Sequence, residues 1–327
     1  MADLITYREA VAAGIAQEMR RDPTVVCLGE DIGAAEGVFK TVAGLFAEFG
    51  PERVWDTPIS EQAIAGAAMG AAMTGMRPVA EIMFSDFLAC CWDYVANEIP
   101  KMRYMTGGQV SVPLVIRTAN GSGLGFGAQH SQPVENWAFA VPGLKIAAPS
   151  TPADMVGLMA AAIRSDDPVL VFEHKALLAT KGEPPPADHV LSLGAAEVRR
   201  PGGDVTLVAL ASTVPTALAA AERLAADGVD AEVIDLRCLV PLDARTVLDS
   251  VARTSRLVIV EENPYQGGWG ATVASIVAEE GFYDLDAPIR RVAGACVPLP
   301  FAANLEQAVV PTVARVADAV RQTLDAA

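Results

Sequence analysis

Apolar residues recur along the first half of the chain at the two spacings typical of helices and strands. Thr6 and Glu9 match the capping-box pattern, and Val11 and Ile15 follow at helical spacing, so a first helix is expected to end near Pro23. The same pattern predicts helices at 41–49, 61–74, 87–103 and 152–164, and strands at 25–28, 53–55, 78–83, 113–117, 145–148 and 169–172.

The alternation of strands and helices stops at 181–203, which contains two clusters of proline and glycine and is predicted to be a linker. It then resumes with strands at 205–211, 231–236, 257–261 and 289–293, and helices at 214–226, 243–252, 268–280 and 308–325. Alternating strands and helices predict parallel sheets with helices on both faces. We therefore expect an α/β protein of two αβα sandwich domains, residues 1–180 and 204–327.

Charge and composition exclude several classes of function. The 327 residues include 40 acidic and 24 basic side chains, for a net charge of -16, which disfavours binding to nucleic acid or to an anionic membrane surface. No apolar stretch reaches the roughly 20 residues of a membrane span, and no signal peptide is recognisable. The five cysteines form no CxxC pair, which favours reduced thiols in a cytoplasmic protein.

Familiar nucleotide-binding and hydrolase motifs are absent, but three segments carry candidate chemistry. Glu61 stands at the start of a predicted helix rich in small residues, where it could be catalytic or could merely complement the helix dipole. His130 follows a glycine-rich loop, 120–127, and suits proton transfer unless it is an ordinary surface residue. Residues 81–87 lie at the end of a predicted strand, where open α/β sheets bind ligands, although ordinary core packing is the commoner explanation for any one of these apolar residues.

Taken in order, these segments resemble one family. Asp56–Glu61, Gly75–Val79, Ala128–Gln132 and Pro142–Lys145 are similar to motifs of the beta subunit of the thiamine-diphosphate-dependent decarboxylase component of 2-oxoacid dehydrogenase complexes. The resemblance continues through Val233–Arg237 and covers nearly the whole chain. It implies a pyrimidine-binding domain followed by a transketolase C-terminal-like domain. Within the family, residues 103–105 and 172–177 most resemble the acetoin dehydrogenase and general bacterial branch.

The resemblance also implies roles for individual residues. Glu61 matches the glutamate that activates thiamine diphosphate from beside its pyrimidine ring, and Phe87 and Met83 match residues that line the ring. His130 matches the loop histidine that steadies reaction intermediates and the incoming lipoyl group. The glycines of the preceding loop suit a segment that orders when the cofactor binds.

A structural potassium ion is a further feature that the resemblance implies. Its matching residues are Leu114, Ala162, Ile163, Ser165 and Asp167, with serine where aspartate is frequent and aspartate where asparagine is frequent. Two other departures, Ala140 and the run 135–137, match positions near the substrate.

The magnesium motif of the superfamily is missing, because Gly203-Asp204 is followed by Val205. The resemblance therefore implies that an alpha subunit holds the diphosphate and its magnesium, in an α2β2 heterotetramer. The C-terminal domain is expected to dock the lipoyl acyltransferase component. Pyruvate, a branched 2-oxoacid and acetoin all remain open as substrates. The alternatives are a single-chain synthase of the transketolase superfamily and a non-catalytic docking subunit.

Overall fold

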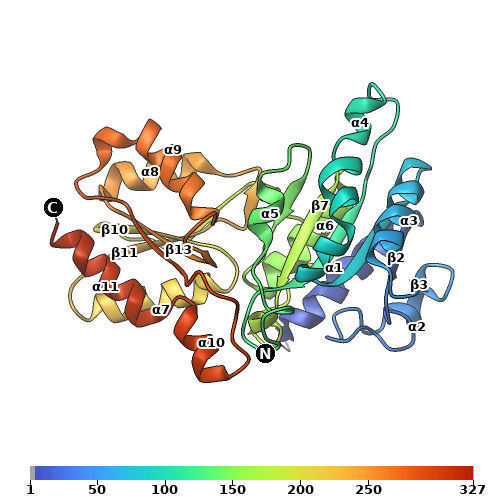
Figure 1. The fold of residues 1–327 in the computed structure, drawn as a ribbon, viewed down its shortest axis with the longest axis horizontal. Coiled ribbons are helices and arrows are strands. Elements are labelled where there is room, and N and C mark those ends of the chain that lie inside the picture. The colour runs from blue at the N-terminus through green and yellow to red at the C-terminus, as the bar shows by residue number, and fades with distance from the viewer. Residues whose placement is uncertain (1–3, 327) are drawn as a thin grey trace. The chain divides into compact units, whose positions relative to one another are not determined.

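The computed structural model describes residues 4–326, which form two compact units (Figure 1). The first unit contains residues 4–121 and 137–193, and the second contains residues 122–136 and 194–326. The segment 122–136 thus belongs with the C-terminal part of the chain, although strands of the first unit flank it in sequence. Strands β8 and β9 lie within the residues predicted as a linker.

The first unit is built on parallel strands in the order β6-β7-β5-β4-β2-β3. Successive residues alternate between the two faces, so that Val79, Val115 and Val171 point into one core. The strand bounds are β2 Val25–Gly29, β3 Val54–Asp56, β4 Arg77–Phe84, β5 Val115–Asn120, β6 Lys145–Ala147 and β7 Val169–His174. A short antiparallel pair, β1 (Ile5–Thr6) and β8 (Lys181–Gly182), lies apart from this sheet.

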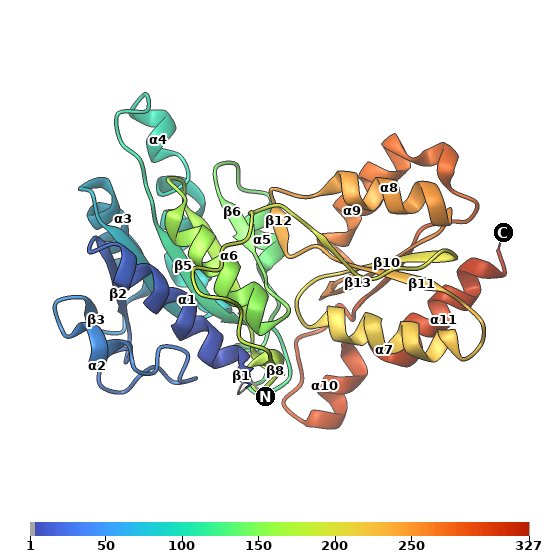
Figure 2. The ribbon, with the colours of Figure 1, turned by 180° about the vertical axis from the view of Figure 1, so that it is seen from behind.

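Helices α1 (Tyr7–Arg21) and α6 (Pro152–Arg164) cover one face of this sheet and lie side by side in Figure 2. The predicted capping box is confirmed, because Thr6 and Glu9 bond each other's backbone N–H groups. A Cβ atom added at Gly14 would lie 3.0 Å from Met159 Cβ, so glycine permits this close helix packing. The helix predicted at 61–74 is confirmed as α3 (Glu61–Met73), which packs against β4.

Two predicted helices of this unit differ from the structure. The stretch 87–103 is a 3₁₀ helix at Ser85–Cys91, a π-helix at Tyr94–Glu98 and the short α4, Met102–Met105. The stretch 41–49 is helical only in α2, Leu45–Phe49, because Gly44 takes a left-handed conformation before it. The pattern also gave no sign of α5, Glu135–Phe139.

The second unit contains a sheet in the order β14-β13-β10-β11-β9, parallel except for the edge strand β9. Helices α7 and α11 cover one face, and α8 and α9 cover the other (Figure 1). The bounds of these strands are β9 Glu197–Arg200, β10 Val205–Ala209, β11 Ala231–Asp235, β13 Leu257–Pro264 and β14 Arg290–Gly294. The short strand β12, Cys238–Val240, is not part of this sheet. The helix bounds are α7 Thr213–Ala225, α8 Ala244–Thr254, α9 Gly270–Glu280, α10 Ala303–Val309 and α11 Val313–Leu324.

The helix predicted at 308–325 is confirmed over Val313–Leu324, as α11, but it begins later than expected because a separate helix, α10, ends at Val309. Pro311 lies between α10 and α11, and the backbone is extended at Val310 and Thr312. All five cysteines are free. Within residues 4–326, no helix is both long and apolar enough to cross a membrane.

Candidate functional site

Glu61 is the first residue of α3 and stands at the carboxyl edge of the first sheet. The amide of Thr57 bonds the carbonyl oxygen of Gly29 at 3.0 Å, which holds the start of the 57–60 loop beside the end of β2. The Glu61 side chain is half-buried, and its carboxylate makes no hydrogen bond or ion pair with any of residues 4–326. The Thr57 hydroxyl oxygen is buried and equally without a partner in that range. The half-buried Glu61 carboxylate is therefore available to a ligand.

Two other segments come close enough to Glu61 to feel its charge. Burial raises the pKa of Glu30, at the end of β2, and the negative charges of Asp31 and Glu61 raise it further. Burial raises the pKa of the Cys91 thiol to about 12, and Glu61 contributes to that shift as well. The end of β2, the start of α3 and the 85–91 helix thus converge on one acidic site.

The small residues of α3 have a local explanation at one position. A Cβ atom at Gly66 would lie 2.9 Å from the ring of Tyr94, so this glycine lets the π-helix pack against α3. Gly70, in contrast, has no atom within 4 Å of such a Cβ, and it leaves the helix surface open there.

Met83 and Phe87 flank the carboxyl end of β4, in the same unit as Glu61. Both side chains are partly buried. The ring of Phe87 meets Phe84 edge to face, with centroids 5.4 Å apart, and Phe84 packs in the same way on Phe39. This row of rings fixes the orientation of Phe87, as a residue that supports a flat ligand requires.

A cavity of about 470 Å³ opens against the same 85–91 helix. It is lined by Ala89, Trp92 and Trp137, and the two indole rings stand edge to face with centroids 6.2 Å apart. Trp137 belongs to the run that departs from the family motif. Ala140, the other departure, is exposed.

His130 belongs to the second unit, together with the rest of 122–136. Its side chain is half-buried, and its backbone N–H closes a turn onto the carbonyl oxygen of Gly127 at 3.3 Å. The structure therefore brings Glu61, Met83 and Phe87 into one unit and assigns His130 to the other.

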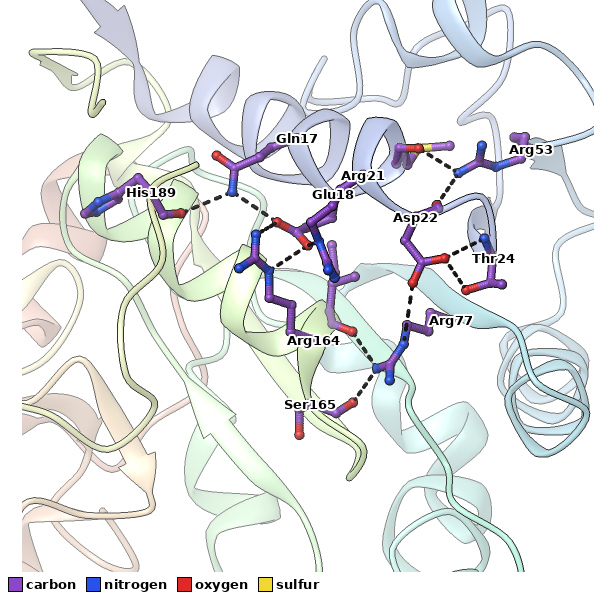
Figure 3. A network of polar contacts seen from close by, with 12 residues as sticks. Gln17, Glu18, Arg21, Asp22, Thr24, Arg53, Arg77, Arg164, Ser165 and His189 are labelled. Carbon is purple, nitrogen blue, oxygen red and sulfur yellow. Dashed lines mark hydrogen bonds and ion pairs between the residues drawn. The ribbon is translucent and has the colours of Figure 1, made fainter. Parts of the chain in front are cut away.

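The predicted potassium ligands gather where α6 ends and where β5 and β7 begin. Each of their backbone carbonyl oxygens already accepts a hydrogen bond from the protein. Arg77 Nη1 donates to Ile163 at 3.0 Å and to Ser165 at 3.1 Å, as Figure 3 shows for Ser165. The remaining pairs are Leu114 with the Val169 amide, Ala162 with the Ser165 amide, and Asp167 with the Ser165 hydroxyl.

Side-chain cations also surround this turn. Arg103 Nη1 lies 2.6 Å from one carboxylate oxygen of Asp167, and Lys145 Nζ lies 3.2 Å from the other. Arg77 itself pairs with Asp166 at 2.6 Å. Because guanidinium and ammonium groups already supply the positive charge, these residues fit a potassium ion poorly. The ion stays a prediction and has no part in the function proposed below.

The sequence reading missed a buried arginine cluster, which comprises Arg117, Glu81, Glu173 and Thr41. Arg117 lies on β5, opposite Glu81 on β4, and it bonds both Glu81 and the Thr41 hydroxyl. Burial lowers the pKa of the Arg117 guanidinium, but the carboxylates of Glu173 and Glu81 outweigh it and raise the pKa above its usual value. Burial raises the pKa of Glu81, and Arg117 opposes that rise. Charged residues inside three otherwise apolar strands were the available signal.

No group of three or more His, Cys, Asp or Glu side chains that could hold a metal ion occurs in the described part of the chain. At Gly203-Asp204 the backbone makes a turn instead, with both amides bonded to the carbonyl oxygen of Asp230.

Comparison with known proteins places these features in a family. Residues 3–181 match the model of the transketolase pyrimidine-binding domain, and residues 194–316 match the transketolase C-terminal domain. A 2-oxoisovalerate dehydrogenase subunit beta from Bacillus subtilis is 44% identical over 98% of both chains. An acetoin:2,6-dichlorophenolindophenol oxidoreductase subunit beta from Cupriavidus necator is 43% identical over 99% of this chain and 98% of that one.

Two further relatives extend the comparison. A mitochondrial pyruvate dehydrogenase E1 component subunit beta-1 from Arabidopsis thaliana is 45% identical over 94% of this chain and 86% of its own. The solved structure of a split gene transketolase, described as an inactive beta4 tetramer, superimposes with a TM-score of 0.81 at 26% identity. That alignment covers 98% of this chain and 99% of the other.

Proposed function

Because this chain belongs to the transketolase-like family of 2-oxoacid and acetoin dehydrogenase beta subunits, we propose that it is the beta subunit of a thiamine-diphosphate-dependent dehydrogenase. With an alpha subunit, it would decarboxylate a 2-oxoacid or cleave acetoin and pass the acyl group to a lipoyl-lysine. The observation that carries this proposal is the half-buried, unpartnered carboxylate of Glu61 at the carboxyl edge of the first sheet.

Thiamine diphosphate, when bound, supplies an acidic thiazolium carbon that becomes the nucleophile. Glu61 would hold a proton at the pyrimidine ring nitrogen through its carboxylate, a role that no competing hydrogen bond within residues 4–326 obstructs. Charge-assisted hydrogen bonds of this kind are about twice as strong as neutral ones.

Phe87 and Met83 would bind the pyrimidine ring through apolar contact. The row of rings behind Phe87 holds it in place, so little side-chain entropy is lost when a flat ring packs on it. His130 would donate a hydrogen bond to the substrate and to the lipoyl group.

We propose that the alpha subunit contributes the diphosphate and magnesium site and that the assembly is an α2β2 heterotetramer. The sequence supports this, because Val205 follows Gly203-Asp204 and interrupts the magnesium motif in this chain. The lipoyl acyltransferase component would dock on the second unit, and the net charge of -16 on the whole chain favours a basic partner. The named relatives act on three different substrates at 43–45% identity, so identity alone does not choose among them.

The test is co-expression with an alpha subunit, followed by thiamine diphosphate titration and dye reduction with pyruvate, branched 2-oxoacids and acetoin. Glu61→Gln keeps the size of the side chain but removes its charge, so we expect an assembled complex with turnover reduced at least ~100-fold. Gln62→Glu, at the exposed next position, is the matched control and should leave turnover unchanged.

Near-normal turnover in Glu61→Gln would sink the assignment of Glu61. Cofactor binding and turnover by this chain alone would instead support a single-chain synthase. An assembled complex that binds the acyltransferase component but never the cofactor would support a docking subunit.

A further inference from the structure

The glycine-rich start of the 122–136 segment is held by two carboxylates from distant parts of the same unit. The Ser122 amide donates to Glu262 Oε1 at 2.7 Å, and the Gly123 amide donates to Glu306 Oε1 at 3.0 Å. Glu262 lies near the carboxyl end of β13, and its other carboxylate oxygen accepts from the Ser212 hydroxyl at 2.7 Å. Both glutamates are more than 90% buried. Buried carboxylates bonded to backbone N–H groups make strong anchors.

The far end of the segment is held by the next residue of β13. Asn263 is fully buried, and its side-chain nitrogen donates to the carbonyl oxygen of Pro133 at 2.8 Å and to Asn136 Oδ1 at 3.2 Å. The Asn136 amide in turn donates to the carbonyl oxygen of Gly267 at 2.9 Å. Two adjacent residues near the end of β13, Glu262 and Asn263, therefore form hydrogen bonds with opposite ends of the 122–136 segment.

Between these anchors the backbone has a defined shape. Gly123, Gly125 and Gly127 all take positive φ, at 105°, 66° and 76°, which side-chain-bearing residues rarely adopt. His130 lies three residues after Gly127, and Ser131 beside it is fully buried. The glycines thus serve a specific loop conformation here.

We propose that Glu262, Asn263 and Glu306 are positioning residues that fix the 122–136 segment and, through it, the side chain of His130. The inference rests on the catalytic role proposed for His130. It gives the C-terminal part of the chain a positioning role in the reaction, exerted through His130. Since a displacement of about 1 Å can cost roughly 100-fold in rate, losing one anchor should lower kcat by roughly 10- to 100-fold.

The experiment uses the complex with its alpha subunit. Asn263→Ala removes both donors without adding charge, and Arg245→Gln, on the exposed face of α8, is the control. Hydrogen exchange of the amides in 122–136 reports on the anchor independently of activity. Turnover is then compared among Asn263→Ala, His130→Ala and the double variant. If Asn263→Ala fails to assemble, Glu306→Ala tests the other end of the segment in the same way.

We expect faster exchange across 122–136 in Asn263→Ala, a lower kcat, and no additional loss when His130 is already alanine. Unchanged exchange would overturn the anchor. Losses that multiply in the double variant would show that Asn263 acts other than through His130, and would overturn the proposed route. Full turnover in His130→Ala would refute the role proposed for His130 itself, and the exchange data would then decide alone whether the anchor exists.

Discussion

Arg117 on β5 holds both carboxylate oxygens of Glu173 on β7, with Nε 2.5 Å from Oε1 and Nη2 2.7 Å from Oε2. Both side chains are almost fully buried, as is Glu81, the other carboxylate of the arginine cluster. One guanidinium therefore bonds two buried carboxylates, one from each of the strands that flank β5. Removing it would leave both carboxyl groups in the core without this positive charge.

Arg117→Met should destabilise the first unit by about 3–5 kcal/mol, because breaking a buried ion pair from one side leaves uncompensated charge. Urea denaturation of the purified chain measures this change. The triple variant Glu81→Gln, Arg117→Met, Glu173→Gln carries no charge at the cluster and should lose less. Arg245→Gln, which breaks an exposed pair with Asp249, should change stability by less than about 1 kcal/mol. A loss in Arg117→Met no larger than in Arg245→Gln would contradict the prediction.

Glu18 should make the stability of the chain depend on pH on the acid side. It is fully buried on α1 and meets Arg164 at the end of α6, as Figure 3 shows. Burial pushes the pKa of Glu18 up, but hydrogen bonds from Arg164, Gln17 and Arg21 outweigh it and hold the pKa below its ordinary value of 4.5. Its contribution is therefore fully present above about pH 4.5 and is lost as the pH falls through the lowered folded pKa.

The measurement is urea unfolding from pH 7 down to about pH 3, for the native chain and for Glu18→Gln. We expect the variant to be less stable at pH 7 and to show a shallower loss of stability on acidification. Glu52→Gln, at an exposed position, should keep the native slope. An unchanged slope in Glu18→Gln would show that other carboxylates set the acid limit.

Phe87→Leu should weaken thiamine diphosphate binding more than it weakens the fold. Leucine keeps the apolar contact with Phe84 but loses the ring, and aromatic pairs contribute about 0.5–1.5 kcal/mol beyond their buried area. We therefore expect the Kd of the assembled complex to rise roughly three- to tenfold. Titration of the complex measures this, with the melting temperature as a check on folding. A Kd equal to that of the native complex would remove Phe87 from the cofactor site.

The elements that sequence patterns predicted well are those with local causes. The capping box at Thr6 and Glu9 and the helix that begins at Glu61 both follow from residues within one or two turns. Pro311 carried a local signal as well, but the apolar period of 308–325 concealed it. The division of 87–103 into 3₁₀ and π turns had no local sequence signal. These turns depend on packing against other elements, as the contact of Gly66 with Tyr94 shows.

The residues of the candidate site likewise divide into those with a local sequence signal and those defined by long-range contacts. Glu61 and His130 could be proposed from motifs that lie within a few residues of each. The anchors of the 122–136 segment could not, because Glu262 and Glu306 bond amides 140 and 183 residues away along the chain. The occupation of the Ile163 and Ser165 carbonyl oxygens by Arg77 is equally non-local, since 86 and 88 residues separate the partners. Such contacts exist only once the chain has folded.

The pKa of Glu30 reports on the charge of Glu61. Burial comes first among the causes that raise the pKa of Glu30, and the charges of Asp31 and Glu61 add to it. Glu61→Gln should therefore lower the pKa of Glu30 toward 4.5, since a glutamine carries no negative charge. Asp31→Asn should act in the same direction, because Asp31 is the larger of the two electrostatic causes. NMR titration of the Glu30 carboxyl carbon measures both shifts. If Glu61→Gln leaves that titration unmoved while Asp31→Asn lowers it, the Glu61 carboxylate points away from Glu30, and the acidic site described at the end of β2 does not include it.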